Sequence, residues 1–205
     1  FVELKRGASM ARVFGLPVNI ITPADVKDLV PLARVDDLVG AVHLPGDGVV
    51  NPIDVTQALA KGARSHGVKI FENVKVERIV IEGGRAVGVI ADGEMIRADA
   101  VVNCAGMWAR ELGDAVGATV PLHAAEHFYI VTEAVEGISP TMPVLRDQDG
   151  CGYFKEDAGK LLVGWFEPVA KPWGMKGISE EFSFTSLPED FEHIAPLIEN
   201  ATHRM

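Results

Sequence analysis

The chain has few cysteines, no excess of basic residues and no long apolar run. Only Cys104 and Cys151 occur among its 205 residues, which argues against a disulfide scaffold and favours a reducing compartment. Its formal net charge of −10 makes nucleic acid or an anionic membrane surface an unfavourable partner. No apolar stretch approaches the ~18 residues that a membrane-spanning helix needs. These absences favour a globular protein without a nucleic-acid or membrane partner.

The composition supports a sizeable core. Hydrophobic residues make up 48% of the chain, and 205 residues suit one domain or two small ones. The chain begins at Phe1 and shows no charged segment followed by an apolar one, so we expect that a preceding segment has been removed.

The stretch around which the rest is organised runs from residue 73 to residue 117. Its first part contains three β-rich runs, which are separated by Gly83-Gly84 and Asp92-Gly93, pairs that suit tight hairpin turns. The pattern predicts an antiparallel meander over 74–81, 86–90 and 95–98.

The second part of this stretch reads as a strand that leads into a helix. Val101-Val102 suggests a short buried strand, Ala105-Gly106 a sharp turn, and residues 108–116 a helix that ends at Gly117. Backbone N–H groups at such a turn, together with the positive end of a helix dipole, can hold an anion such as a pyrophosphate.

Three helices are predicted before the meander. Helical spacing of apolar residues covers 2–14, and Thr22-Pro23 has the cap and first-turn chemistry of a short helix that stops before Pro31. Asn51-Pro52 opens the third helix, which extends towards Gly67. We expect a strand at 69–71 directly after it, as in half of a βαβ unit.

After Gly117 the chain becomes richer in β-branched and aromatic residues. Strands are predicted at 128–132, 153–154 and 161–166, with a turn between the last two at 157–159. The capping-box pattern at Ser186-Leu187-Pro188-Glu189 predicts a helix start there. We expect Phe191, Ile194 and Ile198 to face inward, and Pro196 to kink or split this helix.

Several motifs together resemble the amino-acid-oxidase family of FAD-dependent oxidoreductases. They are Asp47-Gly48-Val49-Val50-Asn51-Pro52 before the meander and Glu126-His127-Phe128-Tyr129-Ile130-Val131-Thr132 after it. Residues 102–111 (VNCAGMWARE) and 143–147 (PVLRD) are most similar to dimethylglycine and sarcosine dehydrogenases within that family. The resemblance covers nearly the whole chain, and it covers the middle of the family's oxidase portion.

The resemblance implies a mixed α/β fold, an α+β combination of two parts. One is part of an FAD/NAD(P)-binding two-dinucleotide fold with an inserted β-meander, and the other is part of a substrate domain built on an antiparallel sheet. Residues 1–45 would be a helical cap segment of the substrate domain, 46–118 part of the FAD-binding domain, and 119–205 part of the substrate-binding domain.

FAD is the cofactor that the resemblance implies, for the full-length protein. Val76 would place its backbone against the adenine, although a sheet residue facing a core is equally compatible with the sequence. Ala105, Gly106 and Trp108 would supply the other FAD contacts. The chain contains no Gly-x-Gly-x-x-Gly loop between a strand and a helix, the usual phosphate site. We therefore expect residues 1–205 alone to lack FAD and activity.

His127 and Tyr153 are the candidate catalytic residues. The family's dehydrogenases carry a histidine in the corresponding His-x-Tyr segment at the substrate pocket, and a ring that titrates near neutral pH suits an amine substrate. The family usually has two adjacent tyrosines where this chain has Gly152-Tyr153. A strand histidine satisfied by a neighbour and an edge-strand aromatic are the purely structural interpretations of the two.

Two other functions are compatible with parts of the sequence. His123-Ala124-Ala125-Glu126-His127 matches a zinc-peptidase pattern in which both histidines and the glutamate lie on one helix. The β-rich residues that follow argue against that helix, and we expect no metal site. A non-catalytic module that pairs with a partner, or with itself, through open sheet edges is the second alternative.

The preferred function is oxidation of an N-methylated or secondary amino acid by hydride transfer to FAD. Its partners would be a small-molecule amine and, in the full-length protein, a folate. The expected location is the cytoplasm, or the mitochondrial matrix in a eukaryote.

Overall fold

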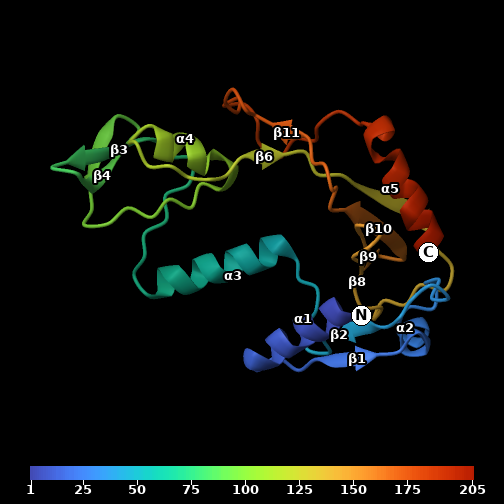
Figure 1. Cartoon of the computed structure of the whole chain (residues 1–205). Helices are drawn as coiled ribbons and strands as arrows, with labels where there is room; N and C mark the ends of the chain where they lie inside the picture. The colour runs from blue at the N-terminus through green and yellow to red at the C-terminus, as the bar shows by residue number, and fades with distance from the viewer. The chain divides into compact units, whose positions relative to one another are not determined.

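The computed structural model describes residues 1–205 and divides into two compact units. The first unit consists of residues 1–50, 127–170 and 188–205, and the second of residues 51–126 and 171–187. Both units contain helices as well as strands, and Figure 1 shows the two classes along the chain. The predicted mixed α/β class is confirmed.

The N-terminal part of the first unit contains two helices and a two-stranded sheet. Helix α1 (Val2–Val13) leads to β1 (Asn19–Ile21), α2 (Pro23–Leu29) and β2 (Ala41–His43), and β1 pairs with β2 antiparallel. The Thr22 side chain accepts from the Asp25 N–H, and the Asp25 carboxylate accepts from the Thr22 N–H, so α2 begins with the predicted cap.

A four-stranded antiparallel sheet forms the centre of the first unit. Its order is β7-β10-β9-β8, from β7 (Tyr129–Ala134), β8 (Leu145–Asp147), β9 (Gly152–Asp157) and β10 (Lys160–Trp165). The β9–β10 turn uses Ala158 and Gly159 with φ of 53° and 80°. The predicted strands and turn of this region are confirmed.

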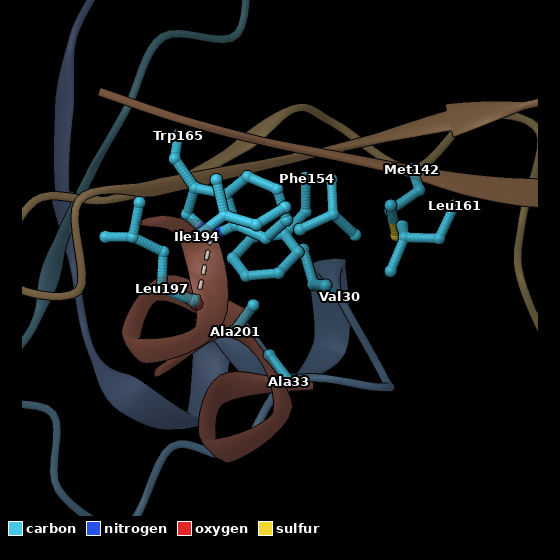
Figure 2. Close-up of a cluster of buried hydrophobic side chains, with 10 residues drawn as sticks. Val30, Ala33, Met142, Phe154, Leu161, Trp165, Ile194, Leu197 and Ala201 are labelled. Carbon is cyan, nitrogen blue, oxygen red and sulfur yellow. Dashed lines mark hydrogen bonds between the residues drawn. The ribbon is translucent and has the colours of Figure 1, made fainter. Parts of the chain in front are cut away.

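The sheet has a covered face and an open face, because side chains alternate along each strand. Phe154, Val163 and Trp165 point to the covered face, where they pack against helix α5 (Phe191–Arg204) and the end of α2. Figure 2 shows this core, in which the Trp165 indole N–H donates to the Leu197 carbonyl at 3.0 Å. The open face is left for other contacts.

Helix α5 differs from its prediction at the start. It begins at Phe191, and the Asp190 side chain accepts from the His193 N–H, so the cap lies four residues beyond Ser186. Ile194 is buried, whereas Phe191 is 60% exposed. Pro196 lies inside one helix that continues to Arg204, because the packing of α5 on the core outweighs one missing hydrogen bond.

The second unit is built around the three-stranded meander. Strands β3 (Val76–Glu82), β4 (Arg85–Ala91) and β5 (Glu94–Arg97) pair in the order β3-β4-β5, as predicted. Both hairpin turns have positive φ, at Gly83-Gly84 and at Asp92-Gly93. Helix α3 (Pro52–Ser65), capped by Asn51, precedes the meander. A short pair of strands, β6 (Ala124–Ala125) and β11 (Pro172–Trp173), completes the unit.

Two predicted strands of the second unit do not form. Residues 69–71 and Val101-Val102 have no paired neighbour, and Val102 is 81% exposed rather than buried. A strand needs a partner for its N–H and C=O groups, and no segment of this chain pairs with either. The helix predicted over 108–116 is a 3₁₀ turn at Gly106–Trp108 followed by α4 (Ala109–Asp114). No helix of the chain is both long and apolar enough to cross a membrane.

Candidate functional site

The open face of the four-stranded sheet carries a row of aligned residues. The strand register places Arg146 opposite Tyr153, Tyr153 opposite Gly164, and Gly164 opposite Tyr129. Directly opposed residues of antiparallel strands share one face of the sheet. A cation, two phenols and a glycine therefore cross the sheet in one line, on the side away from helix α5.

Gly164 makes room for the Tyr153 ring. A Cβ at Gly164 would lie 2.1 Å from Cζ and from the hydroxyl oxygen of Tyr153, far inside the contact distance. The ring thus lies flat across the glycine of the neighbouring strand. Only glycine permits this placement, so Gly164 fixes the height and the direction of the phenol.

His127 lies beside this phenol. Its Nε2 is 3.2 Å from the Tyr153 hydroxyl oxygen, and the two rings are nearly parallel, with an interplanar angle of 12° and centroids 6.2 Å apart. His127 precedes β7 and is exposed, whereas Tyr153 is half-buried on β9. The structure therefore brings together the two residues that the sequence predicts as catalytic, and a hydrogen bond joins them.

Phe166 connects this pair to Arg146. The Phe166 ring lies 5.6 Å from His127 and 5.3 Å from Tyr153 by ring centroids. The Arg146 guanidinium sits over the same ring, with Cζ 4.4 Å from the centroid, a cation–π contact. An exposed aromatic side chain thus has an imidazole and a phenol on one side and a guanidinium on its face.

Glu167 adds a buried carboxylate. Its side chain is only 5% exposed, and its Oε2 lies 3.8 Å from His127 Nδ1. Burial raises the pKa of the Tyr153 phenol, and the nearby Glu167 carboxylate adds to that effect. Tyr153 is therefore held in its neutral, hydrogen-bonding form.

Three members of this cluster were not predicted from the sequence. Phe166 and Glu167 lie two and three positions after Gly164, just beyond the end of β10. Arg146 lies seven positions before Tyr153, and the β8–β9 register makes the two residues direct neighbours. We call His127, Arg146, Tyr153, Phe166 and Glu167 the open-face cluster.

A second candidate site lies in the second unit. A cavity of about 1260 Å³ is lined by all four residues that the resemblance assigns to FAD, which are Val76, Ala105, Gly106 and Trp108. Val76 is 39% exposed and Trp108 38% exposed, so neither side chain is buried in a core and both can contact a ligand. The structure brings these four residues together, although 29 positions separate Val76 from Ala105.

The charges around this cavity suit only part of a dinucleotide. Glu77, Glu111 and Glu180 line it together with a single cation, Lys75, which is already paired with Glu180. Carboxylates accept hydrogen bonds from ribose hydroxyls, and apolar side chains can cover an adenine. Three carboxylates disfavour a pyrophosphate. The residues present fit the adenosine part of FAD and supply no phosphate site.

Two further motifs of the resemblance meet at a smaller cavity in the first unit. Its volume is about 410 Å³, and both Asp47-Gly48-Val49 and Pro143-Val144-Leu145 line it. Val26, Val30 and Met142 supply apolar side chains at the same cavity. Segments almost a hundred positions apart therefore share one surface.

The zinc-peptidase alternative has no structural support. The segment is extended and contains β6, so the helix that this pattern requires is absent, as its β-rich neighbours indicated. The His123 ring lies 3.1 Å from the Ala124 carbonyl oxygen, and Glu126 pairs with Lys171 at 3.5 Å. No group of three or more His, Cys, Asp or Glu side chains is arranged to hold a metal.

Known proteins with similar sequences include several amine oxidoreductases and a phosphatase regulatory subunit. The chain is 39% identical to the mitochondrial pyruvate dehydrogenase phosphatase regulatory subunit of Mus musculus and covers 24% of it. It is 38% identical to 4-methylaminobutanoate oxidase of Paenarthrobacter nicotinovorans and 36% identical to human mitochondrial sarcosine dehydrogenase, covering 24% and 22% of these proteins. At least 95% of this chain is aligned in each case. The chain thus spans about a quarter of the length of these relatives.

Solved structures agree with the fold. L-proline dehydrogenase from P. horikoshii matches with a TM-score of 0.76 at 22% identity, over 98% of this chain and 51% of that one. Glycine oxidase from Geobacillus kaustophilus matches with a TM-score of 0.68 at 25% identity, over 98% and 50%. The family DAO, FAD dependent oxidoreductase, matches residues 2–205. The chain therefore belongs to this FAD-dependent oxidoreductase family.

Proposed function

We propose that the chain acts within an enzyme that oxidises an N-methylated or secondary amino acid, such as sarcosine or dimethylglycine. The observation that carries the proposal is the open-face cluster, in which a histidine, a phenol, an aromatic ring and a guanidinium meet on one sheet face. The names of the relatives support the amine class, since sarcosine and dimethylglycine dehydrogenases are among them.

The chemistry that bound FAD supplies is acceptance of a hydride from the C–H bond next to the amine nitrogen. That nitrogen must first lose its proton, because its lone pair forms the iminium as the hydride leaves. We propose that the His127–Tyr153 pair binds the amine and orients it in this deprotonated form. Water or a folate then traps the iminium carbon.

Selectivity for an amino acid requires a carboxylate site and an amine site. We propose that Arg146 binds the substrate carboxylate, because a guanidinium presents paired donors to a carboxylate. The exposed Phe166 and Tyr129 rings favour a methylated amine, because its N-methyl groups can pack against aromatic faces.

We propose that residues 46–118 contribute to the FAD-binding domain and that 1–45 and 119–205 contribute to the substrate domain. In this arrangement, Val76, Ala105, Gly106 and Trp108 contact the adenosine part of FAD. The cavity that they line in the second unit supports this role. The protein would act in the cytoplasm or, in a eukaryote, in the mitochondrial matrix, and several relatives carry mitochondrial names.

The test is the His127→Ala variant of the FAD-loaded, full-length protein, with His123→Ala as the matched control. We expect His127→Ala to lower kcat/KM for sarcosine or dimethylglycine about a hundredfold, the size of a lost proton-handling group. The flavin spectrum should stay nearly unchanged, because His127 belongs to the substrate face. His123→Ala should retain activity, because its ring contacts only its own neighbour's carbonyl. Flavin loss with unchanged turnover of the remaining holoenzyme would contradict the assignment.

A second candidate function is regulatory, without turnover. It is favoured by the relative named as a phosphatase regulatory subunit, which is 39% identical over the whole chain. Amine-dependent reduction of bound flavin under anaerobic conditions separates the two functions. A protein that binds FAD but shows no reduction with any N-methyl amino acid fits the regulatory function.

A further inference from the structure

The Glu167 carboxylate is in an unusual position for a charged group. Its side chain is 95% buried, and Oε1 has no hydrogen-bond partner. Burying a carboxylate without compensation is costly, so an orphaned oxygen of this kind calls for an explanation. The residue directly follows Phe166 of the open-face cluster, and the proposed chemistry above makes no use of it.

The other carboxylate oxygen faces the His127 ring. Oε2 lies 3.8 Å from Nδ1. This distance is too long for a hydrogen bond, but it is short enough for an electrostatic attraction between the carboxylate and an N–H at Nδ1. A negative oxygen attracts a hydrogen on Nδ1 and repels a lone pair there. Nδ1 should therefore carry the hydrogen. In the neutral ring, Nε2 is then bare, because a neutral imidazole has one N–H only.

The bare nitrogen is the one that faces Tyr153. Nε2 lies 3.2 Å from the phenol oxygen, so a bare Nε2 accepts and the Tyr153 hydroxyl donates. Gly164 and Phe166 hold the two rings in place, and Glu167 determines which nitrogen carries the hydrogen. A buried carboxylate that fixes an imidazole tautomer is a known way to prepare histidine for accepting a proton.

We infer that Glu167 is a positioning residue, which acts through His127 to keep Nε2 free as an acceptor. The effect of Glu167 on amine oxidation rests on the proposed function. The His127 tautomer, with its hydrogen on Nδ1, rests on the geometry of the first unit alone. Glu167 touches neither the substrate nor the cofactor in this role.

The tautomer is measurable without any turnover. In protein labelled with ¹⁵N at histidine, the two ring nitrogens of His127 are read by NMR, with His127→Asn identifying their signals. We expect Nδ1–H in the wild type and a shift towards Nε2–H in Glu167→Gln, which keeps the side-chain size and removes the charge. Glu133→Gln, an exposed carboxylate on β7 of the same sheet, should change nothing. The same His127 tautomer in wild type and Glu167→Gln overturns the inference.

The kinetic arm uses the FAD-loaded, full-length protein. We expect Glu167→Gln to lower kcat/KM at least about tenfold, as carboxylate partners of catalytic histidines do, with partial recovery in Glu167→Asp. In a His127→Asn background, Glu167→Gln should cause little further loss, because both changes remove the same acceptor. If the kcat/KM losses of Glu167→Gln and His127→Asn multiply in the double variant, the role of Glu167 is merely structural. Equal kcat/KM losses in Glu167→Gln and Glu167→Asp would show the same. If no variant and no wild type oxidises an amine, the proposed function fails, and the NMR result still decides the role of Glu167.

Discussion

Arg204 offers the sharpest stability prediction, because one buried side chain ties three segments of the first unit together. Its Nε donates to Asp147 Oδ2 at 2.8 Å, and its Nη1 donates to Asp37 Oδ1 at 2.6 Å and to the Arg34 carbonyl at 2.7 Å. The Arg204 side chain is 7% exposed and that of Asp147 is 11% exposed. These hydrogen bonds raise the pKa of Arg204 and lower that of Asp37. The perturbation is Arg204→Met, which keeps most of the packing volume and removes every donor.

Arg204→Met should lower the free energy of unfolding mainly because it leaves the Asp147 carboxylate buried without its cation. Asp147 would stay buried with only the Gly150 N–H, at 3.0 Å, as its donor. Removing one partner of a buried ion pair typically costs 3–5 kcal/mol, and the half-exposed Asp37 argues for the lower end, about 3 kcal/mol. With a urea m-value of about 2 kcal/mol/M, the unfolding midpoint should fall by about 1.5 M.

The assay must report on the first unit alone, because a chain with two compact units need not unfold in one step. Trp165 is fully buried in that unit, so its fluorescence reports the unfolding there when Trp108 and Trp173 are replaced by Phe. Arg12→Met, at an exposed position of α1, is the matched control and should change stability by less than about 0.5 kcal/mol. A loss below 1 kcal/mol for Arg204→Met, relative to that control, would refute the assignment of a buried ion-pair network.

Three further predictions concern Gly164, Asp36 and FAD binding. Gly164→Ala should displace the Tyr153 ring and lower kcat/KM of the FAD-loaded protein about a hundredfold, with flavin retained; wild-type kinetics would contradict the overlap at 2.1 Å. The hydrogen bonds from Arg34 lower the pKa of Asp36 to about 2, below an unfolded value of about 3.9, so this carboxylate stabilises the fold above about pH 4 and the contribution vanishes as the pH falls towards 2. Urea unfolding of wild type and Asp36→Asn should therefore differ at pH 6 and converge at low pH; a constant difference would contradict it. Residues 1–205 alone should bind FAD weakly or not at all, since no phosphate loop is present, and saturable sub-micromolar quenching of flavin fluorescence would contradict that.

Sequence rules for caps and turns predicted the structure correctly where the deciding residues lie within a few positions of one another. The Thr22 cap, the Asn51-Pro52 helix start and the paired residues of both meander turns form as predicted. In each case, the deciding interaction connects positions close in sequence, such as the Asn51 side chain and the Ile53 and Asp54 N–H groups. Such interactions depend little on the rest of the chain.

Local rules failed where a partner decides the structure. The pair Val101-Val102 has the composition of a strand, but it finds no neighbour with which to pair. Helix α3 forms as predicted, yet none of its residues is buried, and Leu59 is 70% exposed. Pro196 shows the opposite case, because packing of α5 overrides the local cost of a proline. Propensity sets what a segment prefers, and tertiary contacts decide whether that preference is realised.

Two residues of the candidate site were predicted from the sequence, and the other members of the cluster were not. The resemblance pointed to His127 and Tyr153 separately, and the register of β8, β9 and β10 then joined them to Arg146 and Gly164. Register depends on which residues face the core, since a shift by one position would move every side chain to the other face.

The same alternation couples the core to the open-face cluster. On β8, Asp147 faces the buried side and holds Arg204, while its neighbour Arg146 lies on the open face beside Phe166. On β10, Trp165 fills the core and donates to α5, and the residues on either side of it, Gly164 and Phe166, shape the open face. Each core contact therefore fixes the register of a strand whose next residue belongs to the cluster. A buried ion pair on one side of the sheet and a row of polar and aromatic groups on the other are two consequences of a single strand register.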